Sequence, residues 1–81
     1  MPAYVLGNTL PMAYFHYHAI AKNLIADGKL RGYYLTEDHR GISPALVLLF
    51  DDVRHPVMPI REHRFDEYLP LLPEGLFLGW R

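Results

Sequence analysis

One segment constrains the fold of this chain more than any other, the apolar run Ala-Leu-Val-Leu-Leu-Phe at residues 45–50. Its composition and length predict a β-strand, which we place over residues 42–50. Side chains alternate between the two faces of a strand, so Leu46 points one way and Val47 the other. Because both faces of this strand are apolar, the strand needs cover on both sides.

Turn and capping signals divide the rest of the chain into short elements. Gly7-Asn8 ends a first strand, and Asp27-Gly28 ends a helix that Asn8 or Thr9 can cap. Pro70 limits a later helical pattern to one or two turns. The expected elements are strands at residues 3–6, 30–36, 42–50, 53–60 and 76–80, a long helix at 10–27 and a short helix within 65–72.

These elements predict a single α+β domain over residues 1–81. The order is roughly β-α-β-β-β-α-β, which indicates a small two-layer sandwich. One long helix and one short, proline-broken helix pack on a mainly antiparallel sheet. Pro56 and Pro59 remove backbone donors, so residues 53–60 are expected at a sheet edge or in an extended loop.

Size and composition narrow the class of protein. A chain of 81 residues with 51% hydrophobic and 21% charged residues has room for one core and is not typical of disordered chains. It has no cysteine, which excludes disulfides and Cys-ligated metals, and its net charge of −1 provides no general attraction for nucleic acid. With neither a signal-peptide pattern nor an apolar run of membrane-spanning length, we expect a soluble, cytoplasmic protein.

The second face of the sheet predicts an association surface. Two helices of this size can cover one face but not both, and a contiguous apolar patch on a small protein usually marks an interface. We therefore expect a non-enzymatic protein-interaction module of the adaptor, regulator or inhibitor type, acting as a homo-oligomer or by docking on a larger protein. The expected interface residues are Phe15, Ala19, Tyr33, Leu35, Val47, Leu49 and Trp80.

One stretch of the chain is locally basic and supports an alternative function. Arg54, Arg61, His63 and Arg64 lie within eleven residues and are opposed only by Glu62. Such a stretch is typical of a solvated face, but it also fits weak binding of an anion or a single-stranded nucleic acid. The chain contains no glycine-rich phosphate loop, so nucleic acid is the less favoured partner.

The chain has histidines and a serine, but their positions in the sequence do not fit a metal site or a hydrolase. His16 and His18 would project about 200° apart on a helix, so one ion cannot bind both. Ser43, the only serine, is followed by Pro44 and lacks the sequence of a nucleophile elbow. We expect no metal site and no cofactor.

The opening Met1-Pro2, followed by a short strand, resembles the tautomerase family, in which an N-terminal proline acts as general base or nucleophile. The resemblance implies a catalytic Pro2, with Arg31 or Arg40 holding a carboxylate. The chain continues with a hairpin and a broken helix rather than the family's simple β-α-β pattern. The same opening is similar to the first strand of small dimeric α+β barrel proteins with a ferredoxin-like layout, which implies a dimer and supplies no active residue.

Overall fold

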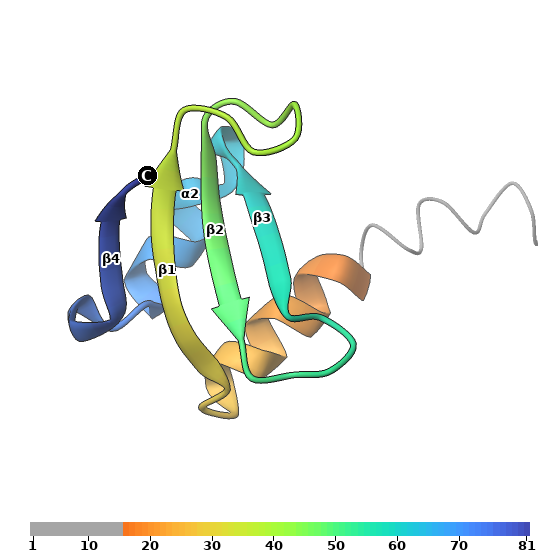
Figure 1. Cartoon of the computed structure of the whole chain (residues 1–81). Coiled ribbons are helices and arrows are strands. Elements are labelled where there is room, and N and C mark those ends of the chain that lie inside the picture. Colours follow the sequence, from red (N-terminus) through yellow and green to blue (C-terminus); the bar gives the residue numbers. More distant parts are fainter. Residues whose placement is uncertain (1–15) are drawn as a thin grey trace, which may run out of the picture.

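The computed structural model describes residues 16–81 and shows one four-stranded sheet with helical segments on one side (Figure 1). The strand order is β3-β2-β1-β4. The predicted strand at residues 3–6, the part of the predicted helix before residue 16, Pro2 and Phe15 lie outside the described residues. The strands are β1 (Leu30–Thr36), β2 (Ala45–Phe50), β3 (Val57–Arg61) and β4 (Phe77–Trp80).

The helical part of the described chain is one long helix and a series of short turns. Residues 16–26 are helical. The second helical segment consists of η1 (Glu62–Arg64), α2 (Phe65–Tyr68) and η2 (Leu69–Leu71), and η3 (Glu74–Leu76) precedes β4. Pro70 lies within η2, so the prediction of a short, proline-broken helix is confirmed.

The α+β class is confirmed, but the sheet is mixed rather than mainly antiparallel. β2 pairs antiparallel with both β1 and β3, whereas β4 pairs parallel with β1. The reason is the path of the chain after β3, which crosses behind the sheet through α2 and reaches the opposite edge (Figure 1). A crossover of this kind brings the next strand in parallel, which a tight hairpin cannot do.

The long helix ends where the sequence predicts. Gly28 has a positive φ of 76°, and the amide of Lys29 donates to the carbonyl of Leu24 at 2.9 Å. The amide of Gly28 donates to the carbonyl of Ile25 at 3.1 Å. This is the Schellman arrangement, which favours glycine because a residue with a Cβ is strained at this φ.

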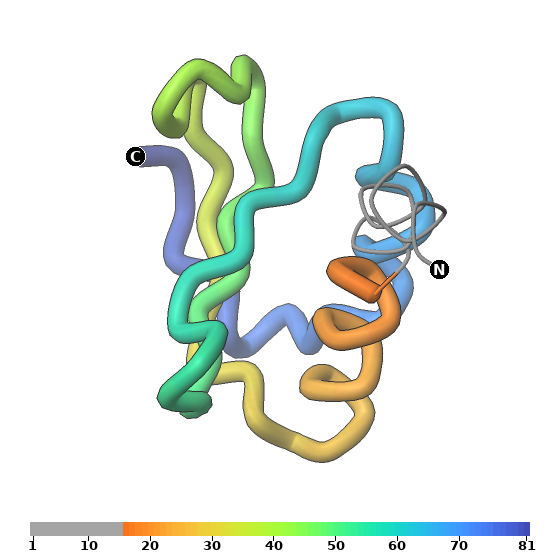
Figure 2. The backbone as a smooth tube through the Cα atoms, turned by 90° about the vertical axis from the view of Figure 1, so that its right-hand side faces the viewer, coloured from red at the N-terminus to blue at the C-terminus, as the bar shows by residue number. Residues whose placement is uncertain are grey.

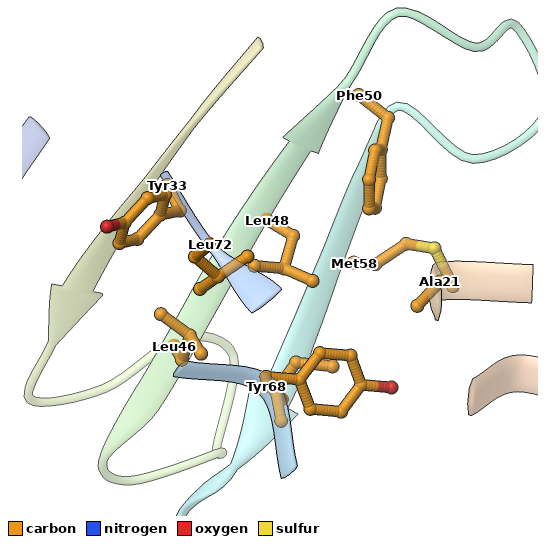
Figure 3. Close-up of a cluster of buried hydrophobic side chains, with 9 residues drawn as sticks. Ala21, Tyr33, Leu46, Leu48, Phe50, Met58, Tyr68 and Leu72 are labelled. Atoms are coloured by element: carbon orange, nitrogen blue, oxygen red, sulfur yellow. The ribbon is translucent and has the colours of Figure 1, made fainter. Parts of the chain in front are cut away.

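The core fills the space between the sheet and the helical segments (Figures 2 and 3). Leu46, Leu48 and Phe50 of β2 point into it and are at most 1% exposed. Tyr68 of α2 closes the opposite side with none of its surface exposed. We call this covered side of the sheet the back face. The remaining buried members of the core are Ala21, Tyr33, Met58, Ile60 and Leu72.

The pairing of β1 with β2 corrects part of the predicted interface. Tyr33 pairs with Leu48 and Leu35 pairs with Leu46, so both lie on the back face with the core. The prediction that they share a face with Val47 was therefore wrong. The register shifts between Leu30 and Gly32. That irregularity sets which face each later residue occupies, and a run of apolar residues gives no sign of it.

The other side of the sheet, the front face, has none of the helical segments of residues 16–81 over it (Figure 2). Nevertheless Val47 has no exposed surface, so the expectation that it faces solvent was also wrong. Tyr34 of β1 and Pro59 of β3 pair with it on either side. Side chains directly opposite one another lie about 5 Å apart, so Tyr34 and Pro59 enclose the valine from either side.

Candidate protein-binding surface

β4 leaves its large apolar side chains in solvent, although it belongs to the sheet. Phe77 is 43% exposed, Leu78 is 42% exposed and Trp80 is 66% exposed. β4 is the last strand of the sheet and pairs only with β1. Among the described residues its outer edge therefore has no strand partner, and an exposed apolar edge strand is a template for pairing with another chain.

A bulge determines which way the side chains of β4 point. Gly79 has a positive φ of 91°, and the register with β1 shifts so that Tyr33 pairs with Phe77 and Leu35 with Trp80. Phe77 and Trp80 therefore both lie on the back-face side of the sheet edge, three residues apart, which a regular strand would not allow. The ring of Phe77 packs on that of Tyr33 with 5.3 Å between the centroids.

Leu78 points to the front face, where a glycine makes room for it. A Cβ placed on Gly32 would come within 3.0 Å of the Leu78 Cδ1 atom. Leu78 thus occupies the space that a side chain at position 32 would fill. As a result β4 presents apolar groups on both sides of an edge that has no strand partner in the described part of the chain.

The opposite edge of the sheet is closed. Pro59 of β3 has no N–H to offer a further strand, as its sequence position predicts, and β3 is indeed an edge strand. The Tyr17 hydroxyl of the long helix donates to the Pro59 carbonyl at 2.8 Å. Burial of the Tyr17 side chain raises the pKa of Tyr17 to about 12. Of the two edges, the outer edge of β4 is the one without such protection among residues 16–81.

The front face next to β4 is apolar at its centre and basic at its rim. Leu49 and Tyr34 are half-buried there, and the guanidinium of Arg81 lies 5.7 Å from the centre of the Tyr34 ring. A cation over an aromatic face at an exposed site contributes about 0.5–1 kcal/mol. We define the β4 surface as this edge strand and the front-face residues beside it, namely Tyr34, Leu49, Phe77, Leu78, Trp80 and Arg81.

The structure brings only some of the predicted interface residues together. Leu49 and Trp80 belong to the β4 surface. Ala19 is exposed on the long helix, behind the half of the sheet that is farther from β4 (Figure 1). Sequence analysis did not place Phe77 and Leu78 among the candidate interface residues. The signal was the apolar run that follows Pro73-Glu74-Gly75, but only the position of β4 at an edge makes that run accessible.

The basic residues of the alternative site are spread over several elements. Arg54 is exposed in the loop before β3, Arg61 ends β3 and His63 is exposed in η1. The guanidinium of Arg64 binds both carboxylate oxygens of Glu67, at 3.0 and 3.2 Å. One of the four basic side chains is therefore already paired with an acidic side chain.

A polar cluster joins the long helix to α2. The Tyr68 hydroxyl lies 2.6 Å from His18 Nδ1, and Lys22 Nζ lies 2.9 Å from a carboxylate oxygen of Glu67. Burial raises the pKa of Tyr68 to about 12, so its hydroxyl stays protonated and shares a hydrogen bond with the His18 ring, whose tautomer sets which group donates. His18 and Tyr68 satisfy one another, and the side chains of the cluster hold two helical segments together rather than presenting a free nucleophile.

Stability is expected to fall in mild acid because of His18. Burial, together with the nearby positive charge of Arg64, lowers the pKa of His18 below its ordinary 6.5. A base with a lowered pKa in the folded state contributes stability above pH 6.5 that is lost as the pH falls through the folded-state pKa. Urea unfolding between pH 7.5 and pH 5 measures this loss. The loss should shrink in His18→Gln and persist in His16→Gln, which alters an exposed histidine.

Comparison with protein-family models, curated proteins and solved structures gives no match to this chain. Within residues 16–81, no three histidine or acidic side chains gather into a cluster that could hold a metal ion. None of the helices in that range combines the length and apolar character needed to cross a membrane. Pro2, the residue on which the tautomerase alternative depends, lies outside the described residues.

Proposed function

We propose that this chain is a non-enzymatic protein-interaction module that binds another polypeptide through the β4 surface. The observation that carries the proposal is the exposure of Phe77, Leu78 and Trp80 on an edge strand whose outer side has no partner among the described residues. Recognition of this kind adds a strand to a sheet, where backbone hydrogen bonds supply affinity and side-chain contacts supply selectivity.

The contrast between the two edges supports this proposal. Natural sheets protect their edges with proline, charge or an overlying element. β3 has two of these protections, Pro59 and the hydroxyl of Tyr17. β4 carries Trp80 and Phe77 instead, and aromatic residues contribute disproportionately to binding energy at protein interfaces.

The nucleic-acid and tautomerase alternatives have weaker support. Arg64 is engaged with Glu67, and the other basic residues of the 54–64 stretch lie on a loop, a strand end and η1. The aromatic side chains of β4 are on the opposite edge of the sheet from Arg61. The exposed aromatic side chains of β4 are therefore not placed beside that basic stretch, where single-stranded nucleic acid would need a stacking surface.

Site-specific photo-crosslinking tests the proposed function. A photoreactive phenylalanine analogue is placed at position 78 on the β4 surface or, as a control, at position 53. Val53 is 97% exposed and lies in the loop after β2. We expect protein adducts in the native host from position 78 and few or none from position 53. Equal labelling from both positions, or none from position 78, would contradict the proposal.

A further inference from the structure

We infer that the polypeptide which pairs with β4 is a second copy of this chain, joined through antiparallel pairing of the two β4 strands across a twofold axis. This inference rests on the proposed function and gives it a partner. The result would be one continuous sheet of eight strands, with the helical segments of both copies on the same side. A twofold interface uses the same patch on each subunit, so that patch must complement itself.

The side chains of β4 are self-complementary in this arrangement. Antiparallel pairing centred between Leu78 and Gly79 places Phe77 opposite the partner's Trp80, and Trp80 opposite the partner's Phe77. The bulge at Gly79 puts Phe77 and Trp80 on the same face, so the two rings of each pair meet. Cross-strand aromatic pairs of this kind stabilise a sheet more than small residues do. Without the bulge, one ring of each pair would point away.

The charges that flank the strand select the antiparallel direction. Glu74 is exposed in η3, just before β4, and Arg81 is exposed directly after it. An antiparallel pair brings Arg81 to the end of the interface that carries the partner's Glu74, and the symmetry repeats this contact at the other end. A parallel pair would place like charges together. Opposite charges at an interface fix its register and exclude wrong orientations.

The length of β4 limits the strength of the dimer. A stable interface buries about 1,600 Å² in total, and a pair of four-residue strands with its flanking side chains is smaller than that. The dimer is therefore weak, and the monomer predominates in dilute solution. Trp80 reports on it directly, because it is the only tryptophan in the chain and is 66% exposed in a single copy.

Analytical sedimentation of the full chain tests this inference. The protein concentration is varied from about 10 µM to about 1 mM, which covers the range of weak association. We expect a monomer–dimer equilibrium and a shift of Trp80 fluorescence to shorter wavelength as the dimer forms. Trp80→Ala should weaken dimerisation about tenfold or more, whereas Val53→Ala should leave it unchanged. Circular dichroism of each variant checks that its fold is intact.

A charge exchange tests the orientation independently of the tryptophan. Glu74→Arg alone and Arg81→Glu alone should each weaken the dimer several-fold at low salt, and the double variant should recover most of the loss. A double variant that is as weak as the single ones would overturn the antiparallel pairing.

The outcomes separate this inference from the proposed function. A chain that stays monomeric to about 1 mM, or a dimer insensitive to Trp80→Ala, overturns the pairing of two β4 strands. Crosslinks from position 78 to a different protein would leave the proposed function in place while removing the second copy as its partner. If the chain stays monomeric and position 78 also gives no protein adducts, both this inference and the proposed function are overturned.

Discussion

Replacing Val47 with aspartate is expected to unfold the protein. Val47 has no exposed surface and lies in β2, which has strand neighbours on both sides. Full burial raises the pKa of a carboxyl group by about 3–5 units. This corresponds to a destabilisation of the folded state of about 4–7 kcal/mol at neutral pH. This is comparable to the whole stability of a small domain, about 5–15 kcal/mol. Circular dichroism at 25 °C should show loss of the native spectrum.

The same substitution at Val53 provides the control. Val53 is 97% exposed, so Val53→Asp introduces the same charge in solvent and should change the free energy of unfolding by less than about 0.5 kcal/mol. If Val47→Asp instead keeps its fold and only changes association, the enclosure of Val47 by Tyr34 and Pro59 is not a feature of the protein in solution.

Replacing Tyr68 with alanine should have the next largest effect. Its side chain is completely buried in the core beneath α2, and its hydroxyl also bonds His18 on the long helix. Truncating a large buried aromatic residue to alanine costs about 3–5 kcal/mol. For a domain of this size, each kcal/mol lowers the melting temperature by about 4–8 °C. Thermal denaturation followed by circular dichroism measures the shift.

Tyr68→Phe separates the hydroxyl from the ring. The phenylalanine retains the packing but leaves His18 Nδ1 without its partner, at a cost of about 1 kcal/mol. Equal losses from Tyr68→Phe and Tyr68→Ala would mean that the hydrogen bond, and not the packing of the ring, provides most of the stabilisation.

Much of the secondary structure could be predicted from local signals. β1 occupies residues 30–36 as expected, Gly28 ends the long helix, and Pro70 lies in a short, irregular helical segment. These features depend on backbone conformations that glycine permits and proline forbids, so neighbouring residues are enough to determine them. β3 begins at Val57 rather than residue 53.

The candidate surface was predicted less well, because it depends on long-range pairing. The sequence indicates an apolar excess on the sheet, and Leu49 and Trp80 do lie on the β4 surface. Tyr33 and Leu35 instead point to the core, since the register shift in β1 decides their face. Phe77 and Leu78 could not be predicted as exposed, because their exposure depends on the position of β4 at the edge of the sheet.

The sequence by itself determined where the long helix ends, the bounds of β1, the approximate positions of β2, β3 and β4, and that β2 needs cover on both sides. Tertiary structure alone decided that β4 runs parallel to β1 at an edge and that Val47 is enclosed by its neighbours. It also decided that, within residues 16–81, the β3 edge is protected and the outer edge of β4 has no strand partner. The physical reason is range: turns and caps are local, whereas register and strand order come from contacts between segments far apart in the chain.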